Sequence, residues 1–371
     1  MRVCLITPRF PPDVGGVAQA SARRARQLGL ATPYTLASPT QKTVTVFTPA
    51  TWPSQAEEAR SAFEKQPWDL IHGYYPSLTG DMAQRLSQWT HTPYLLSARG
   101  NDIDRDIWKL ESRSALLKAL GHADLLTGVS RDLTRKLKAL VPHVPVQYVP
   151  NSVDTQRFCP VSAHEKQSLR EDWQVSEGVC FGFVGEMRTK KGFSLLLKSF
   201  ARLHQNSRTP VHLLVVGPIR EGPDEALYRL WCQQFPEAAR AVKHIPSVDH
   251  ALLHRLYPVL DALVMPSFQE GMANAALEAM STGVPVLATD VGGFPDLIDD
   301  HVSGLLIPPY SESTLFEALM TIAHAPALST KWGRAARHKV LSSFQPTHEK
   351  AAYARAYRQA LQHASLKKRS E

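Results

Sequence analysis

The chain has few cysteines, and they lack the spacings that bind metals or form disulfide frameworks. Its 371 residues contain four, at positions 4, 159, 180 and 232, with no C-x-x-C pair and no nearby histidine cluster at zinc spacing. This pattern argues against a zinc ribbon and a disulfide scaffold. Cys4 and Cys180 lie in apolar, strand-like runs, so we expect buried thiols in a reducing compartment.

Long apolar segments are also absent from the sequence. No run reaches the roughly 18 residues that span a bilayer. The N-terminal stretch MRVCLITPRFPP lacks the apolar region and cleavage site of a signal peptide. We therefore expect a cytoplasmic protein. No segment alternates bases with aromatic residues as a groove for single-stranded nucleic acid does, so we expect no nucleic-acid partner.

Charge is unevenly distributed. The net charge is +8, and residues 1–150 hold 18 Lys and Arg against 12 Asp and Glu, which accounts for +6 of it. Much of the excess lies in residues 104–120 and 130–140. These segments predict either a solvated helix face or a surface for an anionic acceptor or anionic lipid headgroups, with peripheral contact at the inner membrane face.

Short apolar runs alternate with longer helical patterns throughout the chain. Continuous apolar runs separated by helices indicate parallel strands covered on both faces, and so an α/β protein. The strands are expected at 2–7, 43–48, 69–75, 93–98, 123–130, 146–150, 179–186, 211–217, 242–248, 261–267, 284–290 and 304–309.

The series of strands restarts after a polar stretch, residues 154–174. We therefore predict two doubly wound domains, 1–155 and 156–345, whose strand ends face each other across a cleft where ligands bind. Residues 346–371 are expected to form a helix that packs back across the domain junction and ends in a mobile tail.

The loop after the first strand, TPRFPPDVGG, contains the pair Gly15 and Gly16 at the start of a helix. Glycine at a helix N-terminus lets the backbone approach an anion, although a simple turn is the commoner explanation. The loop is not the G-x-G-x-x-G of a dinucleotide-binding fold, which argues against a dehydrogenase.

The loop GEMRTKKG, residues 185–192, contains Arg188, Lys190 and Lys191 between a strand and a helix. Three cations at this place suit a diphosphate, and a solvated basic loop is the alternative.

The stretch QEGMANAALEAM contains two glutamates eight positions apart, Glu270 and Glu278. A helix is expected to begin near Asn274 and to stop at Gly283. Glu278 lies one turn into this helix and leans back toward its start, where the loop Gly271–Asn274 offers N–H groups to an anion. Amides for an anion, flanked by carboxylates that accept from hydroxyls, suit a nucleotide sugar. A carboxylate paired with a lysine is the alternative for Glu278 alone.

These motifs resemble the family 4 glycosyltransferases, retaining enzymes of the GT-B fold with two Rossmann-like domains. The resemblance is carried by VGEMRTKKGFSLLLKSF, by MPSFQEGMANAALEAMSTGVPVLATDVGGFPDLIDDHVSGLLIPP and by YVPNSVDTQRFCP, with looser matches at PPDVGG and PWDLIHGYYP. It implies transfer of a sugar from a nucleoside diphosphate sugar to an acceptor that the sequence does not identify.

The resemblance also implies residue roles. Glu270, Lys191 and Arg188 are the expected catalytic residues: Glu270 contacts the transferred sugar, and Lys191 neutralises the leaving diphosphate in place of a metal. The expected donor-binding residues are Gly15, Gly16, Gly271, Met272, Ala273, Asn274 and Glu278, the last of which would hold the ribose.

The sequence departs from the family pattern at three places. Glu186 stands where the family has an arginine, so Arg188 is the candidate phosphate ligand, and Ser152 replaces a glycine. Arg99 stands where the family has a histidine near the reacting sugar. Arginine cannot act as a base at neutral pH. A leaving phosphate can take the acceptor's proton instead, and Arg99 can bind an anionic acceptor or the donor phosphate.

The candidates for the acceptor or catalytic site, besides Arg99, are Asn101, Asp102 and His72. Asp102 and Asp104 form a D-x-D pair, which we interpret as a helix cap rather than a metal site. His72 ends a strand and can line the cleft or serve a structural role. His250 and His254 are interpreted as ordinary histidines. We predict no metal and no bound cofactor.

Two other functions stay open at this stage. A non-catalytic module that binds a nucleotide sugar or a partner protein is suggested by Arg99 and Glu186. A sugar-nucleotide epimerase or a phosphorylase would share the fold, although no motif indicates a proton-abstracting carboxylate or a cofactor lysine.

Overall fold

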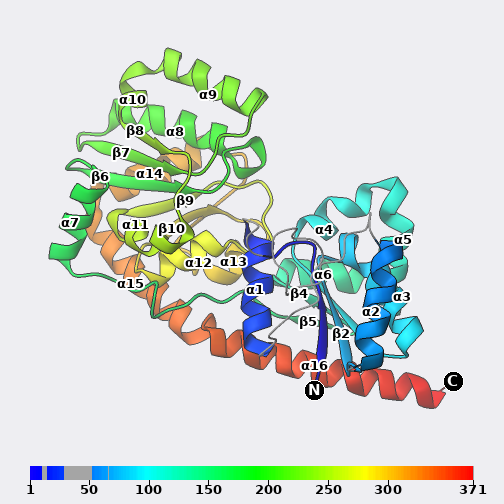
Figure 1. The fold of residues 1–371 in the computed structure, drawn as a ribbon. Coiled ribbons are helices and arrows are strands. Elements are labelled where there is room, and N and C mark those ends of the chain that lie inside the picture. Colours follow the sequence, from blue (N-terminus) through cyan, green and yellow to red (C-terminus); the bar gives the residue numbers. More distant parts are fainter. Residues whose placement is uncertain (11–14, 29–51, 66, 371) are drawn as a thin grey trace. The chain divides into compact units, whose positions relative to one another are not determined.

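The computed structural model describes residues 1–10, 15–28, 52–65 and 67–370. The chain divides into two compact units (Figure 1). The first unit comprises Met1–Asn151 together with Thr347–Glu371, and the second comprises Ser152–Pro346. By its internal contacts, the chain divides between Asn151 and Ser152 and again between Pro346 and Thr347.

The first unit is built on a parallel sheet of five strands in the order β1-β2-β3-β4-β5. Strand pairs are in continuous register, for example Val3 beside Leu70 and Leu95 beside Leu125. The elements of this unit are β1 Val3–Ile6, α1 Gly16–Leu28, α2 Trp52–Lys65, β2 Leu70–Tyr74, α3 Pro76–Thr90, β3 Tyr94–Ala98, α4 Asn101–Asp104, η1 Asp106–Trp108, α5 Leu110–His122, β4 Leu125–Gly128, α6 Arg131–Leu140, β5 Val146–Tyr148 and α16 Pro346–Ser370.

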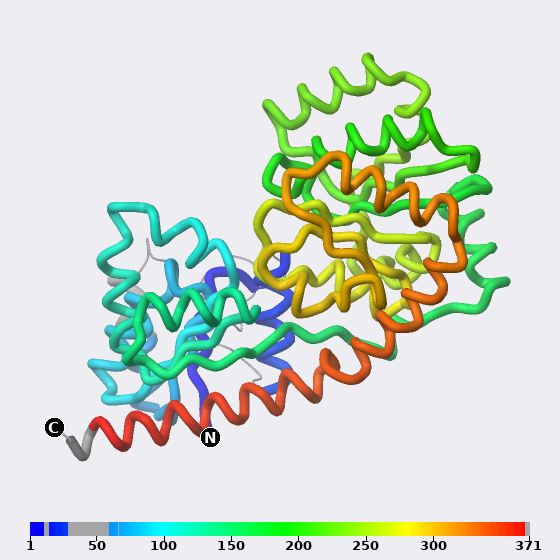
Figure 2. The backbone as a smooth tube through the Cα atoms, turned by 180° about the vertical axis from the view of Figure 1, so that it is seen from behind, coloured from blue at the N-terminus to red at the C-terminus, as the bar shows by residue number. Residues whose placement is uncertain are grey.

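Helix α16 packs on one face of this sheet, and Figure 2 shows it as the long red helix that runs along the first unit. Its apolar residues recur at helical spacing and join α1 and alternate strand residues in one core. The α16 residues of that core are Ala352, Tyr353, Ala356, Tyr357 and Ala360. The last segment of the chain is therefore an integral layer of the first unit.

A buried ion pair ties α16 to α1. Arg23 Nε donates to Glu349 Oε2 at 2.7 Å, and Glu349 is only 1% exposed. Gln27 donates to the same carboxylate at 3.2 Å. A buried carboxylate needs such donors, since an unpaired charge away from water is costly.

The second unit is built on a parallel sheet of six strands in the order β11-β10-β9-β6-β7-β8. Its elements are α7 Ala163–Asp172, β6 Val179–Val184, η2 Thr189–Lys191, α8 Phe193–Asn206, β7 Val211–Val216, α9 Pro223–Gln234, α10 Pro236–Arg240, β8 Val242–Ile245, η3 His250–Leu252, α11 Leu253–Leu256, η4 Tyr257–Val259, β9 Ala262–Met265, α12 Asn274–Ser281, β10 Val286–Thr289, α13 Phe294–Leu297, β11 Gly304–Ile307, α14 Glu312–His324 and α15 Pro326–Ser343.

This strand order is that of a doubly wound sheet, because the chain moves outward from β6 in one direction and then from β9 in the other. The point where the order reverses lies between β6 and β9, which are hydrogen-bonded neighbours. Ligands of such sheets bind at the carboxyl ends of the strands at this switch point. The loops that follow β6 and β9 are therefore the place to look for a site.

The structure confirms eleven of the twelve predicted strands, each within a few residues. The twelfth, expected at 43–48, lies outside the described residues.

Cys4 and Cys180 are buried free thiols, as predicted. Helix α12 begins at Asn274 and ends at Ser281, and Gly283 follows with a φ of +80°, the conformation of a helix stop. Over the described part of the chain, no helix is long and apolar enough to cross a membrane.

Replacing Glu349 by Ala should destabilise the first unit strongly. The change would leave the largely buried Arg23 guanidinium without its carboxylate, and we expect a loss of about 3–5 kcal/mol of unfolding free energy. Urea denaturation followed by circular dichroism measures this loss. The control is Glu64→Ala, which breaks the pair with Arg60, where both side chains are 62% exposed. It should cost less than about 1 kcal/mol. Equal effects of the two variants would contradict a structural role for the buried pair.

Candidate functional site

Two loops of the second unit pack tightly together at the switch point. They follow β6 and β9, at residues 185–192 and 266–273. The backbone N–H of Phe268 donates to the carbonyl of Lys190 at 2.9 Å. Gly192 has a φ of +67°, and a Cβ there would overlap the carbonyl oxygen of Pro266. Glycine is thus required at 192 both by conformation and by space.

A third loop, residues 290–293 after β10, closes on the same place. A Cβ at Gly292 would overlap the carbonyl oxygen of Glu270, and one at Gly293 would crowd that of Gly271. Backbone therefore packs on backbone around Glu270, and the loop that contains it has one well-defined position.

This packing brings Lys191 and Glu270 into direct contact. Lys191 Nζ forms an ion pair with Glu270 Oε2, although 79 positions separate the two residues. Their side chains are 19% and 16% exposed, so the pair is largely shielded but still reachable. The two residues that the resemblance implies for one site are therefore in direct contact.

The turn that holds Lys191 is fixed by a further residue of the second unit. Asp224, at the start of α9, accepts hydrogen bonds from Thr189 N at 2.9 Å and from Thr189 Oγ1 at 2.6 Å. Arg188, in the same turn, pairs with Glu186 at 3.1 Å. Its Nε is buried and has no partner among the described residues. Glu186, the residue that departs from the family pattern, is thus ion-paired with Arg188, the candidate phosphate ligand.

The start of α12 adds main-chain donors to the site. Ala273 occupies the N-cap position and makes no side-chain cap hydrogen bond. Met272 and Ala273 are buried, while Gly271 and Asn274 are partly exposed. The four residues Gly271 to Asn274 directly follow Glu270, so the first N–H groups of an α-helix lie next to the ion pair. Such groups favour an anion.

Glu278 is held by two side chains that the sequence did not link to it. His250 Nε2 lies 3.0 Å from Oε1, and Tyr257 OH donates to Oε2 at 2.8 Å. His250, interpreted from the sequence as an ordinary histidine, thus contacts Glu278, and the partners of this carboxylate are His250 and Tyr257 rather than the lysine of the alternative interpretation. His250 lies 28 positions upstream, and the one available signal was its place shortly after β8, near a carboxyl strand end.

In the first unit, Gly15 and Gly16 begin α1. Gly15 has a φ of +127°, and nothing lies within 4 Å of a Cβ built there. Its glycine is therefore required by conformation rather than by space. The N–H of Gln19 donates to the carbonyl of Gly15 at 3.1 Å, so the helix starts directly after Gly15. Pro11 and Pro12 of this loop lie outside the described residues.

Arg99 directly follows β3. Its Nη2 donates to Asn151 Oδ1, and its guanidinium lies 5.3 Å from the centre of the Tyr74 ring. Asn101, which begins α4, hydrogen-bonds the Tyr75 side chain. The carboxyl end of this sheet thus presents a cation held by an amide and an aromatic face.

Asp102 does not cap the helix predicted after it. It is fully buried within α4, and its carboxylate accepts from the backbone N–H groups of Arg99, Gly100 and Ile103 at 2.6 to 3.2 Å. Burial raises the pKa of Asp102 to about 7, and these three donors act against that rise. Asp102 therefore shapes the loop that presents Arg99.

Asp104 pairs instead with Lys136 at 2.7 Å. Within the described ranges, no three His, Cys, Asp or Glu side chains gather in a way that could hold a metal ion.

His72 has a structural role in this fold. It is fully buried, with Nδ1 2.7 Å from Tyr357 OH and Nε2 2.7 Å from Ser97 Oγ. Burial, followed by the charges of Arg24 and Arg99, holds its pKa well below the usual value, so the ring is neutral. Both ring nitrogens are occupied by α16 and β3, which leaves neither for a substrate.

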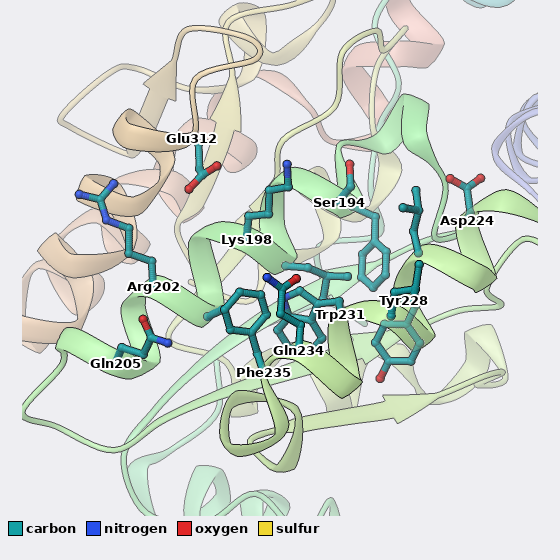
Figure 3. A pocket seen from close by; sticks show the side chains of 15 residues that line it. Ser194, Lys198, Arg202, Gln205, Asp224, Tyr228, Trp231, Gln234, Phe235 and Glu312 are labelled. Atoms are coloured by element: carbon teal, nitrogen blue, oxygen red, sulfur yellow. The ribbon is translucent and has the colours of Figure 1, made fainter.

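A separate cavity of about 520 Å³ lies between α8 and α9 (Figure 3). Aromatic side chains form much of its wall, among them Phe193, Tyr228, Trp231 and Phe235. Its walls are side chains of helices, whose main-chain N–H groups are used within those helices. The loop before α12 offers an anion main-chain donors, so it fits a diphosphate better than this cavity does.

Comparison with known proteins shows the family to which the chain belongs. The family model described as Glycosyl transferases group 1 matches residues 165–339, and the model described as Glycosyl transferase 4-like domain matches residues 1–152. A D-inositol 3-phosphate glycosyltransferase of Actinosynnema mirum is 30% identical over 319 residues, which cover 80% of this chain and 75% of that protein. The putative teichuronic acid biosynthesis glycosyltransferase TuaC of Bacillus subtilis is 26% identical, over 69% of this chain and 61% of that one.

Solved structures share the fold. Sucrose-phosphate synthase from Thermosynechococcus elongatus superposes with a TM-score of 0.82 at 20% identity, covering 97% of this chain and 99% of that one. Anabaena Alr3699/HepE in complex with UDP superposes with a TM-score of 0.81 at 18% identity, covering 96% and 99%. The chain is a family 4 glycosyltransferase, a member of the group 1 glycosyltransferases, and has the two-domain GT-B fold.

Proposed function

We propose that this glycosyltransferase moves a sugar from a uridine diphosphate sugar to an anionic acceptor, with retention of configuration and without a metal ion. The observation that carries the proposal is the contact between Lys191 and Glu270 beside the first N–H groups of α12. A cation and main-chain donors suit the diphosphate, and a carboxylate suits the hydroxyls of the transferred sugar.

Each group has a distinct part in this proposal. The main-chain N–H groups at the start of α12 and the Lys191 ammonium receive the diphosphate, and Arg188 is the second cation. When the diphosphate attracts Lys191, the Glu270 carboxylate is released to accept from sugar hydroxyls. Glu278, one turn into α12, accepts from the ribose. Gly15 and Gly16 of the first unit supply further main-chain donors.

The choice of donor is supported by the structural relatives. Anabaena Alr3699/HepE has been solved in complex with UDP, with UDP and glucose, and with UDP-glucose. These proteins share the fold at 18% identity, so they suggest the first compound to test.

An anionic acceptor is supported by Arg99 and by the named relatives. Arg99 cannot act as a base, but its guanidinium has five N–H donors, and the hydrogen bond to Asn151 uses one of them. The Actinosynnema mirum relative is named for an acceptor that carries a phosphate. In a front-face mechanism, the leaving phosphate takes the acceptor's proton, so the reaction needs no base at position 99.

The donor assignment is tested with a panel of nucleotide sugars that includes UDP-glucose. We expect slow release of the nucleoside diphosphate from one donor, at a rate that EDTA leaves unchanged, because Lys191 replaces a metal at the leaving group. A more than tenfold loss in EDTA would contradict metal independence. Thermal stabilisation by a donor without release would favour a non-catalytic module, and an epimerised donor would favour an epimerase.

Replacing Lys191 by Met should lower kcat/KM about 100- to 1,000-fold, since it removes a charged donor from the leaving diphosphate. Steady-state release of UDP measures the effect. Lys198→Met is the matched control, because Lys198 lies exposed on α8, less than two turns from the start of that helix. Normal turnover in the Lys191 variant would refute its role.

We also propose that the first unit contacts an anionic membrane surface. Two apolar side chains at the turn between η1 and α5 are strongly exposed, Trp108 at 74% and Leu110 at 83%. Arg105, Lys109 and Arg113 lie beside them in sequence and are exposed too. An exposed tryptophan and leucine flanked by bases is the composition that inserts among anionic headgroups.

Vesicle sedimentation tests this surface. The protein should bind vesicles of phosphatidylcholine with 30% phosphatidylglycerol more tightly than phosphatidylcholine alone. The double variant Trp108→Ser and Leu110→Ser should bind them about tenfold less well, because it removes the inserting apolar area. Trp89→Ser is the control, because Trp89 is also exposed, at 47%, but lies near the C-terminal end of α3 rather than at this turn. If both variants bind like the wild type, this turn does not contact the membrane.

A further inference from the structure

Glu278 is a buried carboxylate that, among the described residues, is held by side-chain hydrogen bonds from a histidine and a tyrosine rather than by a lysine or arginine. It is 7% exposed, and each oxygen receives one side chain, His250 on Oε1 and Tyr257 on Oε2. Burial, and then the neighbouring Glu278 charge, raise the pKa of Tyr257 well above its usual value, so its hydroxyl stays protonated and donates. Directional hydrogen bonds of this kind fix the rotation of the carboxylate.

His250 is itself held in place from several sides. It opens η3, where the Asp249 carboxylate caps the turn by accepting from Ala251 N at 2.8 Å. Arg157 donates to the His250 carbonyl at 3.0 Å. The imidazole lies edge-on to the Phe158 ring, with 6.0 Å between ring centres. The ring therefore has little freedom to turn away from Glu278.

The contact requires a proton on Nε2 of His250. A carboxylate only accepts, so His250 must donate through Nε2. A carboxylate offers about four acceptor directions. His250 and Tyr257 use one on each oxygen, which leaves one on each oxygen for two neighbouring hydroxyls. A ribose presents such a pair at its 2′ and 3′ positions.

We propose that His250 is a positioning residue that orients the Glu278 carboxylate toward the two ribose hydroxyls of the donor. The inference rests on the proposed function, because it takes Glu278 as the ribose-binding residue. His250 acts through Glu278 and does not touch the reacting atoms. It is 39% exposed at its side chain, so a substitution there leaves the core of the second unit unchanged.

The test compares UDP with 2′-deoxy-UDP, which lacks one hydroxyl that Glu278 would accept from. Dissociation constants are measured by calorimetry, so the test does not depend on turnover. The wild type should bind UDP about tenfold more tightly than 2′-deoxy-UDP. In His250→Ala, affinity for UDP should fall about tenfold while affinity for 2′-deoxy-UDP changes less, so the ratio approaches one. In turnover, KM for the donor should rise and kcat should change less than about twofold.

Two further variants separate positioning from folding. Tyr257→Phe keeps the ring and removes only the hydroxyl, and it should also lower the preference for UDP over 2′-deoxy-UDP. His250→Gln supplies an amide donor and should restore part of the preference that His250→Ala loses. His254→Ala is the control, since the His254 ring bonds the Ala251 carbonyl of its own turn.

If His250→Ala weakens the binding of UDP and of 2′-deoxy-UDP equally, the inference is wrong and the role of His250 is merely structural. If the wild type binds both equally, Glu278 does not hold the ribose, and the inference fails together with that assignment. Failure of sugar transfer alone, with the binding ratios as expected, would overturn the proposed transfer and support the inference.

Discussion

The loops after β6 and β9 approach so closely that the backbone of one occupies the space where the other would carry a side chain. Gly192, after β6, lies against Pro266, after β9, and Gly292, in the loop after β10, lies against Glu270. Since carbonyl groups cannot shift without disturbing the strands behind them, the loops have a single arrangement. The contact between Lys191 and Glu270 follows from that arrangement, because Lys191 directly precedes Gly192 in the chain and Glu270 lies against Gly292 in space. The site is therefore a property of the sheet order as much as of its charged residues.

The same packing explains how the charges of Lys191 and Glu270 are both stabilised in a largely shielded place. Each side chain is mostly shielded, and an isolated charge in such a place would be costly. Paired, they satisfy each other. A diphosphate brings more negative charge than one carboxylate, so it can draw the lysine away and leave Glu270 free to accept from hydroxyls. In the proposed function, the same two residues would then form contacts with different partners.

Much of this could be predicted from the sequence, for reasons that differ between elements. Strands such as Val179–Val184 are continuous apolar runs because parallel strands are covered on both faces, and this signal survives without any knowledge of neighbours. Glu270 and Lys191 were found because motifs at strand ends carry chemistry. His250 was missed because its importance depends on which loop it meets, and no periodicity connects residue 250 with residue 278. Asp102 was misassigned for a related reason: its three N–H partners belong to a loop whose path depends on Gly100, with a φ of +134°.

The two units present different kinds of group at the carboxyl ends of their strands. In the second unit, glycine and main-chain groups form the surroundings of Lys191 and Glu270, so the geometry is insensitive to most side-chain changes. In the first unit, the carboxyl edge of the sheet presents side chains instead: Arg99 over Tyr74, and the exposed Trp108 at the following turn. Side chains can be exchanged without moving the backbone, whereas main-chain contacts cannot. Trp108 and Arg99 lie outside the core beneath α16, whereas Tyr74 belongs to it, so a change of the first two side chains would leave that core unchanged.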